Sequence, residues 1–182
     1  MNTLIYKQEV SIPYRFIIIN ESESDELRKN VGKTVIKGDD NLTPPGISYS
    51  IRDSDSLSEP LLLTRDNRST VIYRPVFKKG VFVGIDDPPS KNRILSLKTK
   101  RDLIKFNALY GDGGQNYDSI NWDKLSKLYA GFEVVKYFRY TDESGPPELT
   151  KYFRLSRLGG YVWNPKRVMN GIQYAGHVMK SR

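Results

Sequence analysis

The 182-residue sequence contains no cysteine and a single histidine, His177. Without cysteine the chain forms neither disulfides nor thiolate ligand sets, and one histidine cannot supply a zinc site built on several imidazoles. The pairs Asp39-Asp40 and Asp86-Asp87 could hold a hard cation, but both lie in predicted turns, where aspartate is common, so we expect no metal site. The longest apolar run, Phe16 to Ile19, is far too short to cross a bilayer, and the N-terminal residues lack the apolar core of a signal peptide. We expect a cytoplasmic or virion protein that is not secreted through a signal peptide and has no membrane partner.

Signatures of several enzyme classes are missing as well. The sequence contains no G-x-x-x-x-G-K-[ST] segment and no G-x-S-x-G segment, which argues against a P-loop nucleotide site and a nucleophile elbow. A catalytic triad would have to recruit His177, which we expect to be a surface or partly buried residue near the C-terminus. The residue types therefore leave open whether this chain is an enzyme.

Positive charge is concentrated in the C-terminal half of a chain whose formal net charge is +8. Residues 1–90 contain 12 Lys and Arg against 13 Asp and Glu, a balance of −1, whereas residues 91–182 contain 17 against 8, a balance of +9. Such an asymmetry favours an acidic partner, either nucleic acid or protein. The alternative is a solvated basic surface that only keeps the protein soluble.

Local patterns predict an α+β fold with a mostly antiparallel sheet and two or three short helices. We expect a single domain over 1–182, with its basic half at 91–182. Runs of β-branched and aromatic residues predict strands over 14–20, 47–51, 70–77, 81–85, 132–140 and 150–155. The turn residues Lys78, Lys79 and Gly80 predict a tight hairpin between the third and fourth of these strands.

Capping patterns predict the helices. Ser22 followed by Asp25 indicates a short helix, and Thr99 followed by Asp102 indicates another that ends near Tyr110. A further helix is expected over 121–130, with an apolar stripe of Trp122, Leu125 and Leu128.

The tetrapeptide Lys-Tyr-Phe-Arg occurs twice, at 136–139 and 151–154. We expect 133–140 and 150–155 to pair as antiparallel strands around a polar loop that contains a glycine and two prolines. Because side chains alternate along a strand, one face would carry a candidate polyanion-binding set. That set consists of Tyr137, Arg139, Tyr152 and Arg154. The alternative is ordinary cross-strand packing of aromatic residues, with the basic side chains extended over them.

A second constellation is spread over three predicted strands: Arg15, then Ser48 and Ser50, then Glu133. This order resembles the Arg-Ser-Glu class of ADP-ribosyltransferases, with three departures, one of which is the long interval from Ser50 to Glu133. The sequence has Ser-Tyr-Ser where the family has Ser-Thr-Ser, and a glycine two positions before the glutamate where the family has an acidic residue. The resemblance implies NAD as cofactor, with Arg15 binding its phosphates, Ser48 and Ser50 lining the pocket, and Glu133 as the catalytic residue. The alternative is that Arg15 pairs structurally, the two serines lie on a half-exposed strand, and Glu133 is a surface charge.

The segment 95–133 resembles a recurring part of uncharacterised proteins of large DNA viruses that infect amoebae. The resemblance rests on Leu95 to Phe106, which includes an Asp-Leu pair, on a helix led by Trp122, and on the ending Tyr-Ala-Gly-Phe-Glu at 129–133. That family has no settled activity. The resemblance therefore implies a virion component or a host-directed factor without specifying its chemistry.

These patterns favour a non-enzymatic viral or host-interaction module that binds nucleic acid or an acidic protein through its basic C-terminal half and needs no cofactor. The alternative function is a small ADP-ribosyltransferase-like enzyme that uses NAD. A concave pocket joining Arg15, Ser48 and Glu133 would favour the enzyme.

Overall fold

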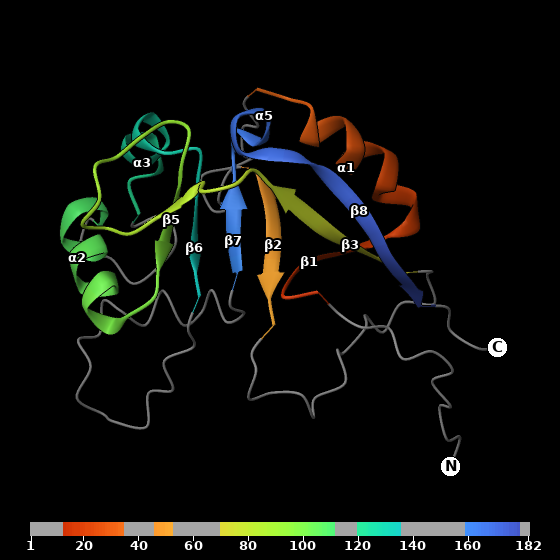
Figure 1. The fold of residues 1–182 in the computed structure, drawn as a ribbon, viewed down its shortest axis with the longest axis horizontal. Helices are drawn as coiled ribbons and strands as arrows, with labels where there is room; N and C mark the ends of the chain where they lie inside the picture. The colour runs from red at the N-terminus through yellow and green to blue at the C-terminus, as the bar shows by residue number, and fades with distance from the viewer. Residues whose placement is uncertain (1–12, 35–45, 53–69, 112–119, 136–158, 179–182) are drawn as a thin grey trace, which may run out of the picture.

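An eight-stranded sheet with helices on its faces forms the architecture (Figure 1). The computed structural model describes residues 13–34, 46–52, 70–111, 120–135 and 159–178. Its strands are β1 (Arg15–Asn20), β2 (Ile47–Ile51), β3 (Thr70–Phe77), β4 (Phe82–Val83), β5 (Ile94–Leu97), β6 (Gly131–Val134), β7 (Gly159–Val162) and β8 (Met169–Val178). Together with the helices, these strands confirm the predicted α+β class.

The sheet is mixed, with the strand order β4-β5-β6-β7-β2-β1-β3-β8. Five neighbouring pairs are antiparallel, as predicted for most of the sheet. The β4–β5 and β5–β6 pairs are parallel. The β5–β6 pair is parallel because a crossover containing two helices connects these strands, and parallel neighbours require a connection of that kind.

The predicted hairpin between β3 and β4 is wrong. Gly80 turns the chain with a φ of 70°, which glycine adopts without strain. However, β3 pairs with β1 and β8 and so has both edges occupied, while β4 pairs with β5. The rings of Phe77 and Phe82 still approach to 5.0 Å between centroids. The sheet therefore curls, and its β4 edge comes back towards the end of β3.

The helices are α1 (Ser24–Val31), α2 (Lys100–Tyr110), α3 (Trp122–Leu128) and α5 (Pro165–Val168), and a 3₁₀ turn, η1 (Glu21–Glu23), precedes α1. The predicted capping box of α2 is confirmed. The Thr99 hydroxyl accepts the Asp102 N–H at 3.1 Å, and the Asp102 carboxylate accepts the Thr99 N–H at 3.0 Å. At η1 the Glu23 carboxylate accepts the Asn20 N–H at 3.0 Å, so this cap begins two residues earlier than predicted. Within the described ranges, no helix is long and apolar enough to cross a membrane.

Apolar side chains on the two faces of the sheet form two cores. On one face, α2 and α3 cover β5 and β6, and Phe106 of α2 stacks on Phe132 (Figure 1). On the other face, side chains such as Ile17 and Tyr49 pack with residues of α1 and α5. Side chains alternate along β6, so Phe132 faces the first core and its neighbour Glu133 faces the second. A carboxylate is thereby placed inside an apolar layer.

The C-terminal elements β7, α5 and β8 were not predicted from the sequence. β7 pairs with β2 and β6, and β8 pairs with β3 along almost its whole length. Glycine weakens strand propensity, and β7 begins with Gly159 and Gly160 while β8 contains Gly171 and Gly176. His177 lies on β8 and is half-buried.

Candidate functional site

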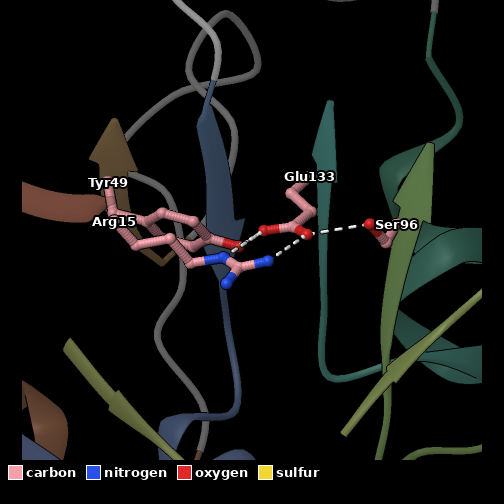
Figure 2. Close-up of polar contacts among 4 residues, drawn as sticks. All are labelled: Arg15, Tyr49, Ser96 and Glu133. Atoms are coloured by element: carbon pink, nitrogen blue, oxygen red, sulfur yellow. Dashed lines mark hydrogen bonds and ion pairs between the residues drawn. The ribbon is translucent and has the colours of Figure 1, made fainter. Parts of the chain in front are cut away.

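Arg15 and Glu133 lie 118 residues apart in the sequence and form a bidentate ion pair on the second-core face of the sheet (Figure 2). The Arg15 Nε donates to Oε2 and its Nη2 donates to Oε1, both at 2.9 Å. The strands β7 and β2 separate β6 from β1, so the Arg15 side chain extends across the sheet to reach its partner. The side chain of Glu133 is 0% exposed and that of Arg15 is 23% exposed. Glu133 is therefore not a surface charge.

Two further donors complete the hydrogen bonding of Glu133. The Tyr49 hydroxyl donates to Oε2 at 2.7 Å, and the Ser96 hydroxyl donates to Oε1 at 2.8 Å (Figure 2). Each carboxylate oxygen thus accepts two hydrogen bonds, which uses the acceptor capacity of an ionised carboxylate. A buried charge is costly unless it is paired and hydrogen-bonded, and both conditions hold here.

The contact between Tyr49 and Glu133 depends on a glycine. Gly160 of β7 lies between them in register, opposite Tyr49 on one side and Glu133 on the other. A Cβ atom at Gly160 would lie 2.6 Å from the Tyr49 hydroxyl oxygen and 2.5 Å from the Phe132 carbonyl oxygen, closer than real side chains approach. The absence of a side chain on β7 therefore lets the tyrosine cross this strand.

Aromatic rings surround the outer part of Arg15. Its guanidinium carbon lies 4.0 Å from the ring centroid of Phe82, 5.1 Å from that of Tyr14 and 5.9 Å from that of Phe77. Burial alone would lower the pKa of Arg15, but the hydrogen bonds and charge of Glu133 outweigh it and raise this pKa. Burial, followed by the charge of Glu133, raises the pKa of Tyr49 well above 10.0. Tyr49 consequently stays protonated and remains a donor to the carboxylate.

The two serines of the predicted transferase set do not join this network. Ser48 and Ser50 alternate with Tyr49 along β2 and so point to the opposite face of the sheet from Glu133. Ser48 is exposed and Ser50 is half-buried. The structure brings together Arg15 and Glu133, as the predicted set requires. The contact expected from a serine is made instead by Tyr49, which lies between the two serines.

A basic hollow lies on the surface beyond the end of β3, open to solvent, with a volume of about 630 Å³. Five cationic side chains line it: Lys78, Lys79, Arg93, Lys166 and Arg167. Thr34, Val81 and Asn92 complete the lining. None of these described lining residues is acidic or aromatic. None of the ion pairs found among the described residues involves any of the five cations.

Neutral acceptors hold three of these cations in place. The Lys78 ammonium donates to the Lys166 carbonyl at 3.0 Å, and Arg167 Nη1 donates to the Asn92 side-chain oxygen at 2.9 Å. Arg93 Nη1 donates to the carbonyl of Gly80. Each bond uses one donor of a group that has three or five, and none of the acceptors carries a charge. Among the described residues, therefore, no carboxylate compensates the positive charge of the hollow.

The cations of the hollow come only in part from the basic half of the sequence, 91–182. Three of its cations belong to 91–182, whereas Lys78 and Lys79 belong to the other half. The predicted polyanion-binding set of Tyr137, Arg139, Tyr152 and Arg154 lies outside the described residues, as does most of the predicted pairing of 133–140 with 150–155. The sequence signal for the hollow was two dibasic pairs, one before a turn glycine and one directly after Pro165.

Comparisons with protein-family models, with curated proteins and with solved structures find no match to this chain.

Proposed function

We propose that the protein binds nucleic acid through the basic hollow. The observation that carries this proposal is the set of five converging cations with no acidic partner among the described residues. Polyanion phosphates supply the missing negative charge, and the release of their condensed counterions drives such binding.

The chemistry of the lining favours phosphate groups over bases. Arginine presents a planar fork that matches phosphate oxygens, and lysine acts as a mobile point charge beside it. None of the described residues that line the hollow is aromatic, so none of them can stack a base. Contacts to phosphates position a nucleic acid but do not read its sequence. We therefore expect binding that depends strongly on salt and weakly on sequence.

The test is to titrate the protein into fluorescent RNA and DNA oligonucleotides and to measure binding by fluorescence anisotropy at several salt concentrations. Charge reversal in the hollow, with Lys79→Glu and Arg167→Glu, should weaken binding. It should also reduce the slope of log affinity against log salt by about one for each phosphate contact that is lost. A matched control reverses Lys98 and Arg101, two exposed cations outside the hollow, and changes the net charge equally.

Equal weakening by the hollow and control variants would show that only net charge matters and would end the proposal. A poly-glutamate peptide of the same charge as the oligonucleotide serves as the competing ligand. If it binds the parent more tightly than either nucleic acid, the partner is an acidic protein instead.

A second candidate function is an ADP-ribosyltransferase-like activity that uses NAD, favoured by the contact between Arg15 and Glu133. The geometry supports it less well, because a catalytic carboxylate has to reach a ribose while Glu133 is buried and already accepts four hydrogen bonds. The same bonds suit a structural role, in which the network ties β1 and β2 to β5 and β6.

NAD consumption by the parent protein and by Glu133→Gln distinguishes these roles. The enzyme hypothesis requires turnover that disappears in the variant at a temperature where both proteins are folded. Absence of turnover in the parent, or equal turnover in both proteins, removes Glu133 as a catalytic residue.

A further inference from the structure

We infer that the basic hollow selects linked phosphates, such as the 5′-triphosphate end of an RNA strand or a free oligophosphate, over the diester backbone of a nucleic acid. This inference rests on the proposed function, because it assumes that the hollow is the binding site. It adds the class of phosphate that the site takes.

The first argument is the convergence of the cations. They come from three separate segments: the turn after β3, the residue that precedes β5, and α5. Cations that track a diester backbone follow a groove or a helix face, whereas these residues line a single hollow. The hollow is open to solvent and has a volume of about 630 Å³, which gives room for a compact anion. A compact anion fits this arrangement better than an extended strand.

The second argument is charge density. A diester phosphate carries one negative charge, and successive phosphates of a strand lie about 3.4 Å apart along the helix axis. A terminal phosphate carries about −1.5 to −2 at pH 7, and it sits directly beside its linked neighbours in an oligophosphate. Linked phosphates therefore place more negative charge in the hollow than an equal length of backbone, and they match its five cations more closely.

The third argument concerns which parts of a ligand the lining can hold. Arg93 and Arg167 supply planar donor forks, while Thr34 and Asn92 add neutral polar groups. Among the described lining residues only Val81 is apolar, so this part of the lining offers no platform for a nucleoside. The phosphates should bind inside the hollow, with the rest of the molecule leaving through its open side.

The experiment compares two RNA strands of one sequence, one with a 5′-triphosphate and one with a 5′-hydroxyl, by anisotropy with the full chain. We expect the triphosphate strand to bind at least about tenfold more tightly, the effect of one added charge-assisted hydrogen bond. Inorganic tripolyphosphate should displace it, whereas orthophosphate and citrate at equal ionic strength should not. Lys79→Ala and Arg167→Ala should each weaken tripolyphosphate binding by about tenfold in calorimetry, and Lys98→Ala should leave it unchanged.

The outcomes separate this inference from the proposed function. If both RNA strands bind equally, and both lose affinity when the hollow charges are reversed, the preference for linked phosphates is wrong and nucleic-acid binding stands. If tripolyphosphate binds in a hollow-dependent way while neither RNA binds, the ligand is a free oligophosphate and the proposed function is wrong. Tripolyphosphate that competes no better than citrate overturns the inference.

Discussion

Replacement of Arg15 by methionine tests the energetic role of the buried network. Methionine is similar in length and keeps contact with the ring of Phe82, but it removes both hydrogen bonds to Glu133. The variant leaves a fully buried carboxylate without its cation. Breaking a buried pair in this way costs about 3–5 kcal/mol. Arg15 is 23% exposed, so water partly replaces the lost charge and the expected loss lies near the lower value.

The assay is urea unfolding followed by circular dichroism, supported by thermal melting. A loss of about 3 kcal/mol corresponds to a fall in melting temperature of about 6–12 °C for a chain of this length. The control is Lys127→Met, which breaks the ion pair of Lys127 with Asp123. Both of those side chains are at least 70% exposed, and an exposed pair contributes less than about 1 kcal/mol.

A double-mutant cycle completes this test. Glu133→Gln removes the charge that Arg15 neutralises, so the double variant Arg15→Met with Glu133→Gln should lose less stability than the sum of the two single variants. The reasoning is refuted if Arg15→Met changes the free energy of unfolding by less than about 1 kcal/mol, or if the two substitutions are additive.

Three further predictions concern Gly160, Tyr49 and the cap of α2. Gly160→Ala should lower the melting temperature strongly, because its Cβ would lie 2.6 Å from the Tyr49 hydroxyl oxygen. The control Gly32→Ala, whose Cβ would have its nearest contact at 3.6 Å, should melt close to the parent. Similar melting temperatures for the two variants would contradict this reasoning. The raised pKa of Tyr49 means that the unfolded chain loses this proton first as the pH passes 10.0, so stability should fall there. Tyr49→Phe should make that alkaline decline shallower in urea midpoints measured between about pH 9 and 11. Thr99→Ala should cost about 1 kcal/mol by removing the α2 cap, and an unchanged urea midpoint would exclude that contribution.

Local structure could be predicted from the sequence where a few neighbouring residues determine it. Thr99 and Asp102 specify a capping box without help from the rest of the fold, and β1 follows from its β-branched run. The α+β class follows from the same kind of pattern. The pairing of strands is different, because it depends on which edges remain free after the whole sheet has formed. The turn at Gly80 is therefore real, while the hairpin expected around it is absent.

The candidate site could be predicted only in part, because its contacts also depend on how distant strands pair. Arg15 and Glu133 were singled out, and they do meet, but no local pattern indicates that they bond directly to each other. The family pattern assigns the pocket to Ser48 and Ser50. Side chains alternate along β2, however, so of these three neighbours only Tyr49 points towards the carboxylate. The role of Gly160 depends on two strands that flank it in space, which no single segment reveals.

The basic hollow was missed because its residues come from segments far apart in the chain. A count of charges by halves indicates an excess at 91–182, but it cannot reveal that Lys78 and Lys79 face the same hollow as Arg167. Net charge by segment therefore could not indicate where the cations gather in the fold.

The most direct measurement of the central claim is a map of backbone amide chemical shifts, recorded by NMR while RNA is added at low salt. Nucleic-acid binding at the basic hollow predicts that the shifts concentrate at 78–79, 92–93 and 166–167 and saturate together. A saturating set of shifts centred on 136–139 and 151–154, with the hollow unaffected, would contradict that claim and favour the repeated Lys-Tyr-Phe-Arg segments instead.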